Sequence, residues 1–215
     1  KTCYFYVDIL EEEAPTITCP TNITQSSTPG QCGATVSFNV AASDNCNVAP
    51  TVTQTAGLAS GSLFPIGTTT LRFQARDFST NTATCSFTIT ITDTQLPTIT
   101  CPANITQVNT TGQCGRAITF GSATASDNCT ASPTITQTGG LASGANFPVG
   151  TNTVTFRAVD AANNSATCSF TVTVNDAQLP SISCPANVTQ TNTTGQCGRA
   201  ITFGSATASD NCTAS

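Results

Sequence analysis

The sequence contains no histidine and no tryptophan, and Lys1 is its only lysine. The absence of histidine removes the usual general base and the Ser-His and Cys-His pairs of nucleophilic catalysis. The acidic residues are scattered, and we interpret the run Glu11-Glu12-Glu13 as a solvated linker. The sequence therefore predicts a protein that is not an enzyme and that has no catalytic residues.

Charge of either sign is also scarce. Charged side chains make up 8% of the chain, and the net charge is −5. No basic patch is present to neutralise phosphates, which argues against nucleic acid as a partner. No apolar run is long enough to span a bilayer, and no signal peptide is visible. Thr, Ser, Asn and Gln supply the solvent face instead, as is common in extracellular β proteins.

The sequence repeats with a period that corresponds to a whole small domain. The cysteine that opens each copy recurs as Cys19, Cys101 and Cys184, at spacings of 82 and 83 residues. Residues 100–132 and 183–215 differ at only three positions. We divide the chain into the last strand of a preceding repeat, two complete repeats and the first part of a further repeat. These four parts are residues 1–13, 14–95, 96–178 and 179–215.

Cysteine is plentiful, with 12 residues in the chain and four in each complete copy. A domain of about 80 residues buries too little surface to be stable through its core alone. An even number of cysteines in so small a domain is typical of disulfides formed in an oxidising compartment. Zinc is the alternative, but zinc sites favour closely spaced pairs and the sequence has no C-x-x-C. We therefore expect a disulfide-reinforced protein outside the cell or at its surface.

Apolar residues alternate with Thr and Ser through much of each copy, and this period of two is typical of strands with one buried face. Runs of this kind occupy residues 34–40, 87–91, 154–158 and 170–174. No segment shows a convincing helical period. About seven short strands per copy, separated by turn residues, predict an all-β fold of tandem β-sandwich domains.

Several motifs recur in a fixed order. Each complete copy carries P-x-I-x-C-P-x-N-I-T, then G-Q-C, S-D-N-C, F-P-[IV]-G-T and A-T-C-S-F-T. This order resembles the HYR (hyalin repeat) domain over essentially the whole chain. The resemblance implies immunoglobulin-like sandwiches, an association with extracellular adhesion and no catalytic residues. The glycine that the family usually has before its last strand is Thr80 in the first copy and Ala162 in the second.

The expected strand positions suggest a disulfide pairing. Cys19 starts the first strand and Cys46 follows the second, so antiparallel pairing would place both near one end. Cys32 with Cys85 then follows by elimination, although a simple sandwich separates these positions and Cys32 could instead cross to a neighbouring domain. Applied to every copy, the predicted pairs are Cys19–Cys46, Cys32–Cys85, Cys101–Cys129, Cys114–Cys168 and Cys184–Cys212.

Calcium is the one cofactor that the acidic residues suggest, although none is required. Each complete copy has an Asp-Asn pair after its second strand and another Asp before its last strand, and each linker carries an Asp. In an immunoglobulin-like topology these groups share one end of the sandwich, so they could bind Ca²⁺ at domain junctions. Their loose spacing favours the alternative that they cap turns. The candidates are Asp44, Asp77, Asp93, Asp127, Asp160 and Asp176.

N-glycosylation sequons are frequent in this Thr-rich sequence. They occur at Asn22, Asn104, Asn109, Asn128, Asn163, Asn187, Asn192 and Asn211. If the source makes N-glycans, we expect several of these residues to be modified.

Two functional hypotheses follow. The first is a non-catalytic structural protein, a repeat array that forms a fibre, stalk or matrix filament. The alternative is an adhesin or binding module that recognises a cell-surface glycan or protein through its domain-end loops. Recognition sites need exposed aromatic or charged groups, whereas these loops consist of Ser, Thr, Gly, Ala and Asn, which favours the first hypothesis. A passive spacer that carries a distal enzyme or adhesin also fits the sequence.

Both ends of the sequence cut through a repeat. Residues 2–9 match the last strand of the next copy, and residues 179–215 lack their final strands, which leaves the core positions Ile201 and Phe203 uncovered. We expect either that the chain continues on both sides or that the terminal strand of one molecule completes the sandwich of the next. Both arrangements give a head-to-tail filament through self-association or continuation.

Overall fold

The computed structural model describes residues 1–8, 10–46 and 48–212. Every regular element in these residues is a β-strand, which confirms the all-β prediction. None of the described segments forms a helix that is long and apolar enough to cross a membrane. The two complete repeats fold with the same strand order, as their similar sequences predict.

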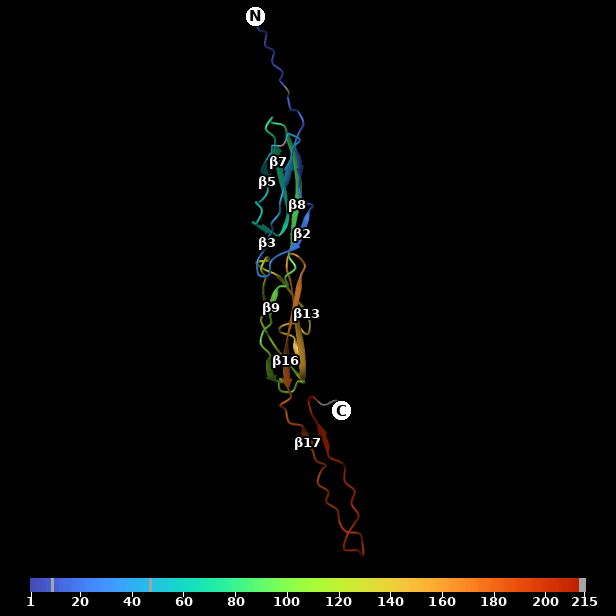
Figure 1. Ribbon diagram of the computed structural model, residues 1–215. Helices are drawn as coiled ribbons and strands as arrows, with labels where there is room; N and C mark the ends of the chain where they lie inside the picture. Colours follow the sequence, from blue (N-terminus) through green and yellow to red (C-terminus); the bar gives the residue numbers. More distant parts are fainter. Residues whose placement is uncertain (9, 47, 213–215) are drawn as a thin grey trace. The chain divides into compact units, whose positions relative to one another are not determined.

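The described residues of the first repeat form eight strands, one more than the sequence predicts. They are β1 (Thr16–Thr18), β2 (Ile23–Ser26), β3 (Gly33–Thr35), β4 (Ala41–Ser43), β5 (Thr51–Ala56), β6 (Leu63–Pro65), β7 (Gly67–Arg76) and β8 (Thr82–Thr92). One sheet has the order β2-β8-β7-β5, with β2 parallel to β8 and the other neighbours antiparallel (Figure 1). The short pairs β1–β4 and β3–β6 form the rest of the sandwich.

The core of the first repeat lies between the four-stranded sheet and the short pairs. Alternate residues of β7 and β8 point into it, as the period of two predicts. Its buried residues are Ala34, Val36, Phe64, Leu71, Phe73, Phe87, Ile89 and Ile91. The predicted run 34–40 is only partly a strand. Beyond Thr35 the Ser60 hydroxyl replaces a partner strand, because it accepts the Phe38 N–H at 2.8 Å and donates to the Phe38 carbonyl at 2.7 Å.

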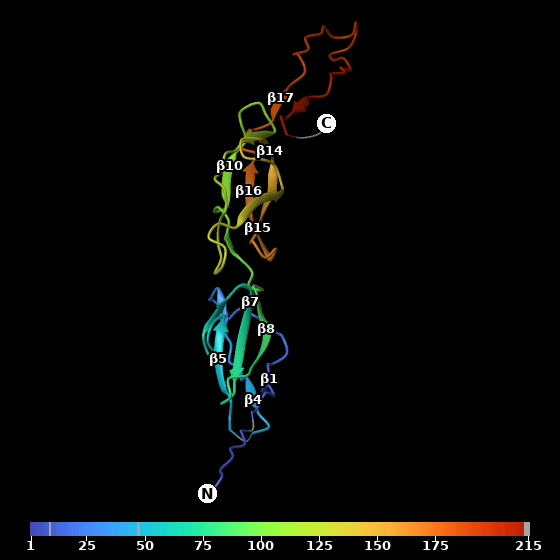
Figure 2. The ribbon, with the colours of Figure 1, turned by 90° about the horizontal axis from the view of Figure 1, so that it is seen from above.

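The second repeat reproduces this arrangement. Its strands are β9 (Thr98–Thr100), β10 (Ile105–Val108), β11 (Gly115–Ala117), β12 (Thr124–Ser126), β13 (Thr134–Gly139), β14 (Asn146–Pro148), β15 (Gly150–Val159) and β16 (Ser165–Asn175). The sheet order is β10-β16-β15-β13, and Figure 2 shows β10, β16 and β15 side by side. Its buried core is Ile118, Ala123, Phe147, Val154, Phe156, Phe170, Val172 and Val174.

The incomplete parts of the sequence are largely exposed. Strands β17 (Ser181–Ser183) and β18 (Thr207–Ser209) pair as β1 and β4 do. Without the facing strands, Phe203 is 76% exposed. The strand predicted over residues 2–9 does not form in its described part, residues 2–8, because no strand lies beside it to complete a ladder. Ile9 lies outside the described residues.

The chain divides into two compact units whose boundaries do not follow the repeats. The first unit contains Lys1–Thr98 together with Ser126–Thr134 and Val159–Ala166, which are loop regions of the second repeat. The second unit contains Ile99–Ala125, Ile135–Ala158 and Thr167–Ser215. Two loops of the second repeat thus belong to the same compact unit as the first repeat.

Candidate functional site

The candidate site is built from four segments of the first unit: the turn 28–33, the linker 93–97, the loop 126–134, which contains the Ser-Asp-Asn-Cys motif, and the loop 159–166. The turn is closed by the Thr28 N–H, which donates to the Gly33 carbonyl at 2.8 Å. Its Gly30 has a φ of 77°, in the left-handed region where glycine is unstrained. The Gly30 N–H donates to Gln95 Oε1 of the linker at 2.7 Å.

A disulfide joins the turn to the loop. Cys32 is bonded to Cys129, with a Cα–Cα distance of 4.8 Å. Beside it, the Asn128 amide donates to the Gln31 carbonyl at 3.0 Å. The predicted pair Cys32–Cys85 is therefore wrong, and the alternative that Cys32 crosses to a neighbouring repeat is correct. The turn is thus joined to the loop by a disulfide and a hydrogen bond, and to the linker by the hydrogen bond between Gly30 and Gln95.

The other two disulfides lie within repeats. Cys19 is bonded to Cys85 and Cys101 to Cys168, with Cα–Cα distances of 5.8 and 5.7 Å. The predictions Cys19–Cys46, Cys101–Cys129 and Cys114–Cys168 are therefore wrong, and the predicted pair Cys184–Cys212 is not formed, since both cysteines are free. The free cysteines are Cys3, Cys46, Cys114, Cys184, Cys197 and Cys212.

The antiparallel register explains the error. Cys19 follows the end of β1 rather than starting a strand. In the β1–β4 pair Thr16 lies opposite Ser43 and Thr18 opposite Ala41, so the ends of the two strands point in opposite directions. Cys46, which follows the end of β4, is therefore at the other end of the pair from Cys19. The same register separates Cys184 from Cys212, since Ser181 lies opposite Ser209.

Three carboxylates converge beside the Cys32–Cys129 disulfide. One ligand oxygen each from Asp93, Asp127 and Asp160 lies within 4.8 Å of the others. Asp93 is 8% exposed and Asp160 is 5% exposed. Asp93 Oδ2 and Asp127 Oδ1 are buried and have no hydrogen-bond partner, and neither does Oδ1 of the neighbouring Asn128. Unpartnered buried carboxylate oxygens are costly, and a hard cation would satisfy them.

The same carboxylates also cap turns, as the sequence predicts. Asp127 Oδ2 accepts the Cys129 and Thr130 N–H groups, both at 2.9 Å. Asp160 accepts the Asn164 N–H at 2.7 Å and its side-chain amide at 2.8 Å. Capping thus accounts for one oxygen of Asp127 and both of Asp160. It leaves the second oxygen of Asp127 unexplained.

The first repeat has an equivalent cluster that includes a residue missed in the sequence. Glu11, Asp44 and Asp77 line a cavity of about 220 Å³ together with Cys46. The Asn81 amide donates to Glu11 Oε2 and to Asp77 Oδ2, both at 2.8 Å. Glu11 is half-buried here, so its interpretation as a solvated linker residue is wrong. The signal was its position four residues before Pro15, which matches the position of Asp93 before Pro97.

In this first cluster the pKa of Asp77 is lowered and the pKa of Cys46 is raised. Burial opposes ionisation of Asp77, but hydrogen bonds from the Asn81 side chain and backbone, and one shared with Glu11, keep its pKa below the ordinary value. Partial desolvation raises the pKa of the Cys46 thiol, and the negative charges of Glu11 and Asp44 raise it further. Cys46 therefore stays a thiol rather than a thiolate at neutral pH.

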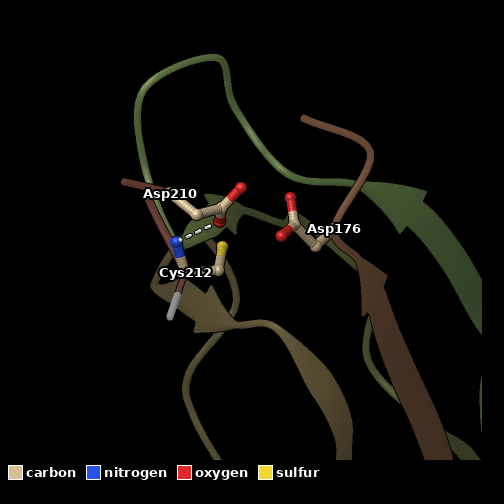
Figure 3. Close-up of side chains that lie close together, drawn as sticks. All are labelled: Asp176, Asp210 and Cys212. Carbon is tan, nitrogen blue, oxygen red and sulfur yellow. Dashed lines mark hydrogen bonds between the residues drawn. The ribbon is translucent and has the colours of Figure 1, made fainter. Parts of the chain in front are cut away.

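A third cluster lies in the second unit. Figure 3 shows the Asp176 and Asp210 carboxylates beside the Cys212 sulfur, with the Cys212 N–H donating to Asp210 Oδ1 at 2.9 Å. Asp210 is a second residue that the sequence argument missed, although its Ser-Asp-Asn-Cys motif repeats that of Asp127. Desolvation raises the pKa of Cys212 to about 12, together with hydrogen bonding of the Cys212 thiol to Cys114 and Asp176 and the negative charge of Asp176.

The predicted sequons differ in how far their amides are engaged. Asn109 is buried and bonded at both ends of its amide, donating to Gln113 and Asp176 and accepting from Ala177. The Nδ2 groups of Asn128, Asn192 and Asn211 also donate to backbone carbonyls. The exposed Asn22, Asn104, Asn163 and Asn187 are better placed for a glycan.

One exposed aromatic side chain was also missed. Phe78 lies in the turn between β7 and β8 and is 88% exposed. It borders a cavity of about 330 Å³ that Arg76 and Asp77 also line. The equivalent position in the second repeat is Ala161.

A family model for the HYR domain matches residues 10–91 and 92–174. Hyalin of Strongylocentrotus purpuratus is 36% identical over 203 residues, which cover 91% of this chain and 17% of that protein. Hyalin of Lytechinus variegatus is 33% identical over 227 residues, which cover 96% of this chain and 40% of that protein. The chain thus spans less than half the length of either relative.

Among solved structures, the protocadherin gammaB7 EC3-6 cis-dimer is 18% identical, with 80% of this chain and 54% of that chain covered at a TM-score of 0.33. The family matches, in contrast, cover most of the chain. The chain therefore belongs to the HYR domain family, as a tandem array of extracellular or cell-surface repeats.

Proposed function

We propose that this chain is a segment of a structural array, a fibre, stalk or matrix filament in which each repeat is cross-linked to the next. The observation that carries the proposal is the Cys32–Cys129 disulfide, which joins a turn of the first repeat to a loop of the second. A binding module needs its loops free to meet a partner. Here the Ser-Asp-Asn-Cys loop is instead used for a bond to the preceding repeat.

The size of the loop that this disulfide closes supports a mechanical role. Cys32 and Cys129 are 97 residues apart in sequence. In the chain-entropy model, closing a loop of that length stabilises the folded state by roughly 4–5 kcal/mol. That stabilisation acts on the connection between repeats, because Cys32 and Cys129 lie in different repeats.

We also propose that Ca²⁺ binds at Asp93, Asp127 and Asp160. The cluster offers carboxylate oxygens of the kind that Ca²⁺ prefers, and two of them are buried without a partner. Bound Ca²⁺ would offset most of the charge of the three carboxylates and hold the linker against both loops. The clusters at Glu11, Asp44 and Asp77, and at Asp176 and Asp210, are the corresponding positions of the other repeats.

Electron micrographs of the secreted protein, prepared with Ca²⁺ and without reductant, test the structural role. We expect head-to-tail filaments that shorten when the disulfides are reduced. Isolated particles that remain separate at high concentration would contradict it.

The adhesin remains a second candidate because of one observation, the exposed Phe78 beside a cavity lined by Arg76 and Asp77. An aromatic ring next to charged groups is the composition of a recognition site. Screening the chain and a Phe78→Ala variant against cell-surface glycans and proteins distinguishes the two functions. Saturable binding that the variant loses would favour the adhesin.

A further inference from the structure

We propose that Cys114 and Cys212 form a second disulfide between repeats, equivalent to Cys32–Cys129. Cys114 occupies the turn of the second repeat and Cys212 the Ser-Asp-Asn-Cys loop of the third. Both belong to the second unit of the structure, where they are free thiols. The proposal adds a covalent link that is independent of the array proposed above.

The hydrogen bonds around this pair repeat those around Cys32–Cys129. The Asn211 amide donates to the Gln113 carbonyl at 2.9 Å, as Asn128 donates to Gln31 at 3.0 Å. The Gly112 N–H donates to Gln178 Oε1 at 2.7 Å, as Gly30 donates to Gln95. Turn, linker and loop therefore meet in the same way at both places.

The two cysteines are held beside one another. Gln113 and Asn211, the residues that precede them, are joined by a hydrogen bond. Asn109 fixes both sides of the pair, because its amide donates to the Gln113 carbonyl at 3.1 Å and lies 3.8 Å from Cys212 Sγ. The turn and the loop thus surround Cys114 and Cys212 with the same contacts that surround the Cys32–Cys129 bond.

This assignment also explains the cluster in Figure 3. Asp176, Asp210 and Cys212 together have the composition of a mixed oxygen and sulfur metal site. Cys129, which occupies the position of Cys212 in the other cluster, is bonded to Cys32 and is not available as a ligand. Cys212 therefore belongs to a disulfide, and its two Asp neighbours correspond to Asp93 and Asp127.

The same positions assign a partner to two other free cysteines. Cys46 lies in a Ser-Asp-Asn-Cys loop and Cys197 in a Thr-Gly-Gln-Cys turn. Each would pair with the complementary cysteine of another HYR repeat. In every repeat the turn cysteine would then form a disulfide with one neighbouring repeat, and the loop cysteine would form a disulfide with the other.

The chemistry is thiol–disulfide exchange with a small-molecule disulfide such as oxidised glutathione. One cysteine thiolate attacks the small disulfide, forms a mixed disulfide and releases one thiol. The second cysteine thiolate then attacks the mixed disulfide and releases the other thiol. Two electrons and two protons pass from the cysteines to the small disulfide, which leaves as two thiols.

The test is alkylation of the full chain after equilibration with a mixture of reduced and oxidised glutathione, in which isolated cysteines return to thiols and paired cysteines stay oxidised, followed by non-reducing peptide mapping. We expect a Cys114–Cys212 peptide and at least a tenfold lower alkylation of Cys114 than of Cys46. The Cys32–Cys129 peptide serves as the internal reference for correct folding. The variant Cys212→Ser should restore alkylation of Cys114, whereas the matched variant Cys197→Ser should leave it protected.

Two results would overturn the proposal while the reference peptide is intact. One is alkylation of Cys114 to the same extent as Cys46. The other is a Cys114 peptide linked to a cysteine other than Cys212. Either result would leave the Cys32–Cys129 link, and with it the proposed array, unaffected.

Discussion

Replacement of Asp127 by Asn should stabilise the protein without Ca²⁺, and this gain should disappear with Ca²⁺. In the wild-type chain the Asp127 carboxylate lies within 4.8 Å of two others, Asp93 and Asp160. At about this distance each pair of like charges costs on the order of 1 kcal/mol where water screens it well. Asp127→Asn removes two such pairs, and the Asn oxygen can still accept the Cys129 and Thr130 N–H groups. We therefore expect a gain of roughly 1–2 kcal/mol in chelator.

With Ca²⁺ this advantage of the variant should disappear. Extracellular calcium modules bind with dissociation constants of about 0.1–1 mM. At about 10 mM Ca²⁺ such a site stabilises the folded protein by roughly 1.4–2.7 kcal/mol. The Asp127→Asn variant loses one of three carboxylate ligands and most of this gain.

The assay is thermal unfolding of both proteins in chelator and in Ca²⁺, where about 1 kcal/mol corresponds to roughly 4–8 °C for a domain of this size. Asp8→Asn is the matched control, because it makes the same charge change at an exposed position. It should leave both melting temperatures unchanged. If Ca²⁺ raised the melting temperature of Asp127→Asn as much as that of the wild type, the calcium site would be refuted.

Two further predictions concern single positions. Thr80 has a φ of 80°, a strained conformation for a β-branched residue, so Thr80→Gly should raise the free energy of unfolding by roughly 0.5–1.5 kcal/mol in denaturant melts. Asn163→Gly at the equivalent position, φ 69°, should change it by less than about 0.5 kcal/mol because Asn tolerates this region, and equal effects would contradict the strain argument. In a eukaryotic secretory host, mass spectrometry should find glycan on Asn104 and none on the buried Asn109, and the reverse pattern would show that the Asn109 contacts do not form.

The sandwich could be predicted from the sequence because its signal is local. The alternation at 154–158 and 170–174 is encoded within each strand, and the structure buries Val154, Phe156 and Phe170 accordingly. The position where the family usually has glycine was assigned to Ala162 in the second repeat, but the residue with a positive φ there is Asn163. The backbone conformation therefore identifies this position, which the sequence alone placed one residue too early.

The disulfide pairing could not be predicted because it depends on which strand ends meet in space. Whether Cys19 starts or follows β1 decides between Cys46 and Cys85, and sequence patterns locate strand ends only to within a few residues. The acidic cluster was partly predictable from topology. Glu11 and Asp210 were missed because one lies in a run of charges and the other in an incomplete repeat.

The account rests on the claim that the turn of one repeat is bonded to the loop of the next. Non-reducing peptide mapping of the oxidised chain measures this directly through the partner of Cys32. We predict that Cys32 is recovered with Cys129 and that Cys19 is recovered with Cys85. Recovery of Cys32 with Cys85 and of Cys19 with Cys46 would confine every bond to one repeat and contradict the account.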